Sequence, residues 1–163
     1  MELFIGILIL YLIIRTVSPD KPKKRKQRKP LFKKRYDLDR RQSIHVFEEK
    51  MANAMLREGK EIFVTAFCNN NDVVTVTATV GSRSSCRPSD NVYNWGKKAR
   101  RIGATRIRQY HNHPPVFGRS SISSKDKRSN VFFHEILKKD SIGFRSFLVF
   151  PSRLGGYRIQ GYD

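Results

Sequence analysis

The sequence predicts a single α/β (α+β) domain in which a mixed, largely antiparallel sheet is flanked by helices. Runs rich in β-branched and aromatic residues alternate with segments whose apolar residues recur at helical spacing. Turn-forming residues separate two adjacent strand-like runs, which predicts a β-hairpin. The chain of 163 residues is long enough for one hydrophobic core, so we expect one folded domain.

The apolar N-terminus predicts a transmembrane anchor at residues 1–17. Leu3 to Ile14 are wholly apolar, and as a helix the anchor would span roughly 25 Å, slightly less than the ~30 Å hydrocarbon core of a bilayer. Because the basic cluster follows this segment, the positive-inside rule places the N-terminus outside and the domain in the cytoplasm. We expect a single-pass protein of the cytoplasmic membrane; a helix packed on the domain or on a partner is the alternative.

Residues 18–41 are expected to form a basic juxtamembrane linker. Arg15 to Arg41 contain thirteen Lys or Arg and three Asp, and they account for +10 of the formal net charge of +19. This segment is too polar to be buried. Beside a membrane it would bind anionic lipid, with about 1 kcal/mol per basic residue. Nucleic acid is the competing partner, through counterion release, and a solvated linker without a partner is the third interpretation.

The folded domain is expected at residues 42–163 and begins with a helix. Apolar residues recur there at helical spacing, and a glycine follows as a stop signal: Ile44, Phe47, Met51, Met55 and Gly59. This pattern predicts that one helix face packs on the core. His45, Glu48 and Glu49 are expected on the solvent-facing side.

A hairpin and a second helix follow. Glu61 to Cys68 and Val73 to Val80 are predicted strands joined by an Asn/Asp-rich turn. Ser89-Asp90 is the expected N-cap of the next helix, in which Trp95 packs in the core rather than stacking on substrate, and Gly103 ends it. Cys68 and Cys86 lack a metal-binding spacing and are expected to be reduced thiols, in keeping with a cytoplasmic setting.

Two histidines at the end of the next strand suggest a metal site. If Arg106 to Tyr110 form a strand, its period of two places His111 and His113 on one face. Asp126 follows after a short interval. Two imidazole nitrogens and one carboxylate oxygen are a ligand set for catalytic Zn²⁺, which keeps its fourth position for water.

These residues belong to a wider pattern that resembles the JAB/MPN metalloprotease superfamily, and most closely its RadC-like bacterial branch. The resemblance covers roughly Glu61 to Pro151. The matching segments are Asn91 to Gly96, Arg101 to Ala104, His111-Asn112-His113-Pro114 and Ser123-Ser124-Lys125-Asp126. Nine residues separate His113 from Ser123, where the family pattern has seven, which indicates a two-residue insertion between Val116 and Ser121.

The resemblance implies an MPN (cytidine-deaminase-like) fold and hydrolysis of a peptide or isopeptide bond, typically in a ubiquitin-like conjugate. His111, His113 and Asp126 would hold Zn²⁺, and Glu61, at the start of a strand, would be the general base. Ser123 would position the water or stabilise the oxyanion. Asn112 points to the opposite strand face and is expected to be structural.

Alternatives remain at several of these positions. Ser123 and Asp126 also match a capping box before the helix that carries Val131, Phe132, Ile136 and Leu137. His134 is an alternative ligand, and Glu48 or Glu49 is an alternative to Glu61 as the acid. Two other functions compete with the peptidase. One is a RadC-like module that binds DNA or a protein complex, and the other is a degenerate JAB scaffold that binds without cleaving. The strand-like runs at residues 143–150 and 156–160 complete the predicted sheet.

Overall fold

The computed structural model describes residues 33–36, 41–82, 86–88, 90–113 and 121–162. The anchor predicted at residues 1–17 and residues 18–32 of the predicted linker lie outside these ranges. Among the helices that the structure describes, none has the length and apolar character needed to cross a bilayer.

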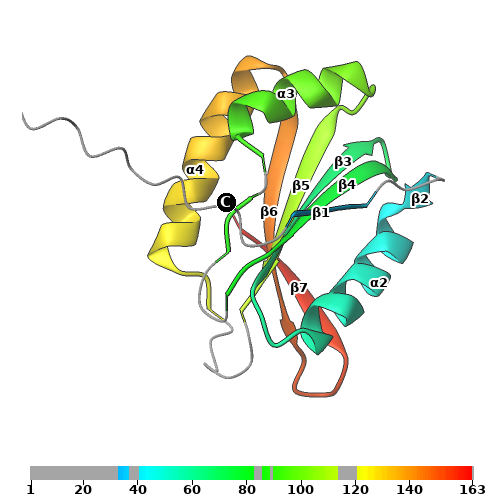
Figure 1. Ribbon diagram of the computed structural model, residues 1–163, viewed down its shortest axis with the longest axis vertical. Helices are drawn as coiled ribbons and strands as arrows, with labels where there is room; N and C mark the ends of the chain where they lie inside the picture. Colours follow the sequence, from blue (N-terminus) through cyan, green and yellow to red (C-terminus); the bar gives the residue numbers. More distant parts are fainter. Residues whose placement is uncertain (1–32, 37–40, 83–85, 89, 114–120, 163) are drawn as a thin grey trace, which may run out of the picture.

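Seven strands form one mixed sheet with helices on both faces (Figure 1). The order is β1 (Lys33–Tyr36), β4 (Asp72–Val80), β3 (Ile62–Asn69), β5 (Arg106–Asn112), β6 (Gly143–Pro151) and β7 (Tyr157–Tyr162), and the short β2 (Gln42–Ser43) also pairs with β4. Only β5 and β6 are parallel; the other pairs described are antiparallel. The helix α4 (Ser124–Lys139) connects this parallel pair, since parallel strands need a crossover. The predicted mixed, largely antiparallel sheet flanked by helices is confirmed.

Strand β1 lies inside the segment that the sequence predicts as a linker. Its four residues pair antiparallel with β4, from Lys33 opposite Thr79 to Tyr36 opposite Val76. This pairing satisfies backbone groups of β4 that would otherwise form an open sheet edge. The sheet therefore begins before residue 42, where the domain was expected to start.

The predicted hairpin is confirmed as β3 and β4. Asn69 pairs with Asp72, and the two residues between them form the turn. Asn70 there has φ +52°, a left-handed conformation that asparagine tolerates better than most residues. On its other side β3 pairs with β5, and this register places Phe63 opposite His111.

Helix α2 (Ile44–Arg57) covers one face of the sheet. Ser43 caps it by accepting a hydrogen bond from the Val46 amide at 3.4 Å. Its buried residues Phe47, Met51, Ala52 and Met55 join a core cluster with β3, β4, β5 and β6. The helix therefore follows the predicted apolar pattern, although it ends at Arg57, before Gly59.

Helices α3 (Val92–Arg101) and α4 cover the opposite face (Figure 1). The predicted N-cap at Ser89-Asp90 is wrong, because Asn91 caps α3 by accepting a hydrogen bond from the Tyr93 amide at 3.2 Å. Gly103 follows the helix with φ +69°. Trp95 is 1% exposed and belongs to the second core cluster, as expected.

Glu48 departs from the expected solvent-facing position. Its carboxylate accepts hydrogen bonds from Arg108 at 2.6 Å and from the Tyr110 hydroxyl at 2.7 Å. Only 18% of the Glu48 side chain is exposed. His45 and Glu49 are exposed, as predicted. Glu48 therefore links α2 to the central strand β5.

Candidate metal centre

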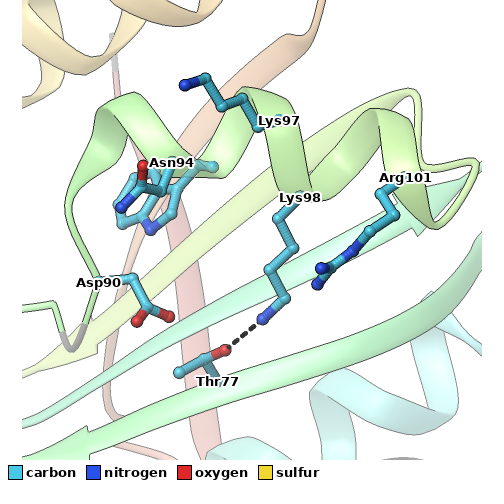
Figure 2. A pocket seen from close by; sticks show the side chains of 7 residues that line it. Thr77, Asp90, Asn94, Lys97, Lys98 and Arg101 are labelled. Carbon is cyan, nitrogen blue, oxygen red and sulfur yellow. Dashed lines mark hydrogen bonds between the residues drawn. The ribbon is translucent and has the colours of Figure 1, made fainter.

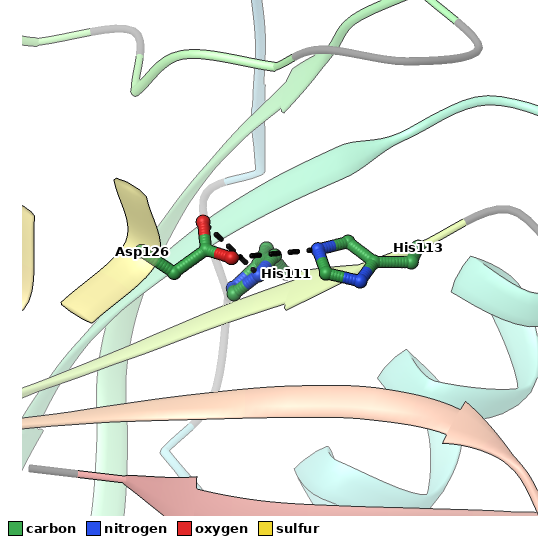
Figure 3. A group of neighbouring side chains, drawn as sticks. All are labelled: His111, His113 and Asp126. Atoms are coloured by element: carbon green, nitrogen blue, oxygen red, sulfur yellow. Dashed lines mark ion pairs between the residues drawn. The ribbon is translucent and has the colours of Figure 1, made fainter. Parts of the chain in front are cut away.

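The end of β5 and the start of α4 bring three candidate ligands together (Figure 3). His111 lies in β5, His113 follows the last residue of that strand, and Asp126 lies in the first turn of α4. One ligand atom from each residue lies within 4.8 Å of the other two. The prediction that the two histidines and Asp126 converge is confirmed.

Both imidazoles present Nε2 to the same carboxylate. The distances are 3.7 Å from His111 Nε2 to Asp126 Oδ1 and 3.6 Å from His113 Nε2 to Asp126 Oδ2. Both exceed the usual N–H···O hydrogen-bond length of about 2.9–3.0 Å. Ligand atoms held at about 2.1 Å from a tetrahedral zinc lie roughly 3.4 Å from each other. The two imidazoles therefore lie beyond direct hydrogen-bond length of the carboxylate, and the three ligand atoms, all within 4.8 Å of one another, leave space for a cation between them.

His111 supplies a second sign of fit. The residue is 2% exposed, and its Nε2 is buried without a hydrogen bond to any residue that the structure describes. A buried polar atom in this state is costly unless a partner satisfies it. A cation between the three ligand atoms would be such a partner.

Tyr162 contacts His111 on the Nδ1 side of the imidazole ring. Its hydroxyl oxygen lies 3.4 Å from His111 Nδ1, and the two rings meet edge to face at an interplanar angle of 86°. Burial, and then the charge of Asp126, raise the pKa of Tyr162, so the hydroxyl keeps its proton. No sequence pattern links Tyr162 to His111, because Tyr162 lies in the last strand, 51 positions later.

Asp126 is held as a carboxylate by its neighbours. Burial raises its pKa, but the nearby imidazoles of His111 and His113, together with the hydrogen bond from Ser123, outweigh burial and lower the pKa far below the ordinary aspartate value. The carboxylate is therefore ionised at neutral pH, which is the form that binds a metal.

Ser123 and Asp126 form the predicted capping box as well. Ser123 Oγ accepts a hydrogen bond from the Asp126 amide at 3.2 Å, and Asp126 Oδ2 accepts from the Ser123 amide at 2.9 Å. The Ser123 hydroxyl also donates to Oδ2 at 2.5 Å. Capping and metal ligation are thus compatible, because the cap orients the same carboxylate that faces the histidines.

Glu61 lies immediately before β3, beside this cluster. Its amide donates to the Ser82 carbonyl at 2.9 Å, and its carbonyl accepts from the Gly81 amide at 2.7 Å. Burial raises the pKa of its half-buried carboxyl, and the charges of His111 and His113 oppose that shift. Glu61 is therefore within electrostatic reach of both histidines.

Asn112, between the two histidines, points to the opposite face, as expected. Its Oδ1 accepts from the Ile62 amide at 2.6 Å, and its Nδ2 donates to the carbonyls of Met55 and Lys60 at 3.2 Å each. The residue ties the end of α2 and the start of β3 to β5. By holding Ile62, it also fixes the backbone next to Glu61.

The remaining sequence candidates lie apart from the cluster. His134 is exposed on α4 and is not part of the group of candidate ligands found among the described residues. Cys68 and Cys86 are free thiols, as predicted. Cys86 Sγ donates to the Thr79 carbonyl at 3.2 Å, and Glu61 contributes to raising its pKa, which places this thiol near the general-base candidate.

No protein-family model matches this sequence, and no curated protein shows significant similarity to it. The resemblance to the JAB/MPN superfamily therefore stays a hypothesis. The functional interpretation depends on the chemistry of the side chains that the fold brings together.

Proposed function

We propose that this protein is a metal-dependent hydrolase of JAB/MPN type that cleaves a peptide or isopeptide bond in a protein substrate. The observation that carries the proposal is the convergence of His111, His113 and Asp126 within 4.8 Å, with Glu61 in electrostatic reach. Two imidazoles and one carboxylate suit zinc better than the hard cations Mg²⁺ or Ca²⁺, which prefer oxygen ligands.

His111, His113 and Asp126 would hold zinc with three protein ligands, the number that catalytic zinc sites use when they keep a place for water or substrate. A zinc ion held there would supply Lewis-acid chemistry, since it lowers the pKa of water and polarises a carbonyl. His111 and His113 would hold the ion through their Nε2 atoms, and Asp126 would contribute one negative charge. The buried position of His111 limits solvent on that side of the site.

Glu61 is the proposed general base. It would take a proton from the attacking water and return it to the leaving amine. Burial raises the pKa of its carboxyl above the ordinary glutamate value, and a higher pKa makes the carboxylate a stronger base. The Asn112 bond to the Ile62 amide holds the backbone beside it.

Ser123 is assigned a positioning role. Its hydroxyl proton is engaged by Asp126 Oδ2 at 2.5 Å, which favours orientation of the carboxylate over donation to an oxyanion. The family resemblance implies that Ser123 stabilises the oxyanion. For that role, the Ser123 hydroxyl would have to donate to the oxyanion in place of Asp126.

The substrate class and location follow from the resemblance and the charge pattern. A ubiquitin-like conjugate is the proposed substrate. The proposed arrangement is a cytoplasmic catalytic domain tethered by residues 1–17, with the basic segment 18–41 on anionic lipid. None of these assignments depends on the geometry of the metal centre.

A RadC-like module that binds DNA is the second candidate function. Its support is the net charge of +10 on residues 42–163, which comes from twenty basic and ten acidic residues. It predicts steeply salt-dependent DNA binding that survives His111→Ala. A degenerate scaffold is the third candidate, supported by the capping role of Asp126 and the altered spacing from His113 to Ser123.

The decisive experiment compares zinc content and isopeptide cleavage in full-length variants. The wild type should hold about one zinc per chain, and His113→Ala should lose it. Glu61→Gln should keep zinc and lose cleavage by about 10²–10⁴-fold, while the control Glu49→Gln, at an exposed helix position, stays active. Full activity of Glu61→Gln would refute the assigned base, and zinc-free wild-type protein would refute the metal site.

A further inference from the structure

A pocket lies between α3 and β4, and its lining residues do not include the three candidate metal ligands (Figure 2). Its volume is about 380 Å³. The residues around it are mostly polar or basic: Thr77, Asp90, Asn94, Trp95, Lys97, Lys98 and Arg101. With three cations and one carboxylate, the lining carries a net charge of +2.

Lys98 forms the inner part of this basic pocket. Its ammonium donates to Thr77 Oγ1 at 3.0 Å and lies 4.5 Å from the centroid of the Phe67 ring. In Figure 2, Lys98 and Arg101 extend from α3 towards β4, whereas Lys97 extends from the other side of the helix. Two cationic side chains of one helix therefore extend towards the same strand.

The basic residues of α3 differ in whether their charge is neutralised. Arg100 forms an ion pair with Asp140 of α4 at 2.5 Å. Lys97 and Arg101 form no ion pair with the residues that the structure describes. The charge of Arg101, which extends towards β4, is thus available to an incoming anion.

The pocket faces the same side of the sheet as the metal centre. Across the sheet, Thr77 of β4 pairs with Thr65 of β3, and Thr65 pairs with Gln109 of β5. His111 lies two residues after Gln109 in β5, so its side chain is on the same face. With strands about 4.8 Å apart and about 3.4 Å per residue, Thr77 and His111 are roughly 12 Å apart. A short extended peptide can reach both places.

We propose that this pocket binds a carboxylate of the protein substrate, from an acidic side chain a few residues from the bond that is cleaved. That the ligand is a substrate rests on the proposed hydrolase function. Binding of the carboxylate itself does not require the metal. A pocket of this size accommodates one side chain rather than a nucleic-acid backbone. Asn94 and Thr77 add neutral polar groups beside the cations.

Trp95 provides a direct readout, because it lines the pocket and is the chain's single tryptophan. Full-length protein is titrated with an oligoglutamate peptide, and Trp95 fluorescence is recorded. A saturable change is expected, with oligoglutamine inactive. Arg101→Gln should weaken binding about tenfold, the typical effect of losing a charge-assisted hydrogen bond. Arg100→Gln removes the same charge from the neighbouring position and should leave the affinity unchanged.

Several results would overturn the proposal. Equal affinities in Arg101→Gln and wild type would show that the peptide binds elsewhere. Equal weakening by Arg100→Gln would show that the peptide responds to the overall charge of α3 and not to the pocket. Tighter binding of an oligothymidylate in the same assay would show that the pocket binds phosphate. His113→Ala separates the two hypotheses: the fluorescence response should persist there without zinc. Loss of the response in that variant would place the peptide at the metal centre and overturn the pocket.

Discussion

The hydroxyl oxygen of Tyr162 lies 3.4 Å from Nδ1 of His111, on the side of the ring away from Asp126. Nε2 of the same ring faces the Asp126 carboxylate. If Nδ1 carries the proton and donates it to Tyr162, Nε2 keeps its lone pair for a metal. Partners of this kind fix the tautomer and orientation of ligating histidines. A residue of the edge strand β7 thus orients a candidate metal ligand on the central strand β5.

Tyr162→Phe should weaken zinc binding while leaving the fold intact. Loss of a group that supports a metal ligand typically costs about 10–100-fold in affinity, and we expect the lower end because the contact is long. Competition with a chelator of known affinity measures the effect. Tyr157→Phe, in the same strand but packed against the α2 core, is the matched control. Equal affinities in all three proteins would show that Tyr162 does not orient His111.

Ser123→Ala and Asp126→Asn should separate capping from metal binding. Removal of the Ser123 hydroxyl should lower the free energy of unfolding by about 1 kcal/mol, as expected for a lost N-cap, and most zinc should remain bound. Asp126→Asn should abolish zinc binding, since the ionised oxygen is lost. Urea denaturation and zinc content measure the two effects, with exposed Ser124→Ala as control. Full zinc binding by Asp126→Asn would leave Asp126 with a capping role alone.

Glu48→Gln should destabilise the domain. The substitution leaves Arg108, whose side chain is only 23% exposed, without its ion-pair partner. We expect a loss of about 1–3 kcal/mol in the free energy of unfolding, as for a hydrogen bond to a charged group. Glu49→Gln, one position away and exposed, should change it by less than about 0.5 kcal/mol. Similar values for the two variants in chemical denaturation would contradict the assigned role of Glu48.

Both cysteines should react slowly with thiol reagents in the folded protein. Burial raises the pKa of Cys68 to about 11 and, together with the charge of Glu61, raises the pKa of Cys86 to about 12. The reactive thiolate is therefore scarce at mildly alkaline pH. Alkylation followed by mass spectrometry should be at least about a hundredfold slower than in the unfolded chain. Rapid modification of Cys86 in the native state would contradict this environment.

Local sequence patterns predict the features that depend on neighbours along the chain. The hairpin, the apolar face of α2 and the shared face of His111 and His113 follow from periods of two or 3.6 residues. The cap at Ser123 and the carboxylate of Asp126 lie within a single helical turn. The N-cap of α3 was placed too early, because Ser89, Asp90 and Asn91 are all acceptable caps and the sequence does not distinguish them.

Only the tertiary structure revealed the partners that come from distant segments. Tyr162 reaches His111 because β7 pairs with β6 and β6 with β5, and local periodicity does not specify strand order. Glu48 becomes half-buried through Arg108, which lies 60 positions later. The basic pocket likewise requires α3 to lie over β4. The sequence by itself therefore determined which side chains share a face of an element, whereas packing between elements decided which of those faces meet.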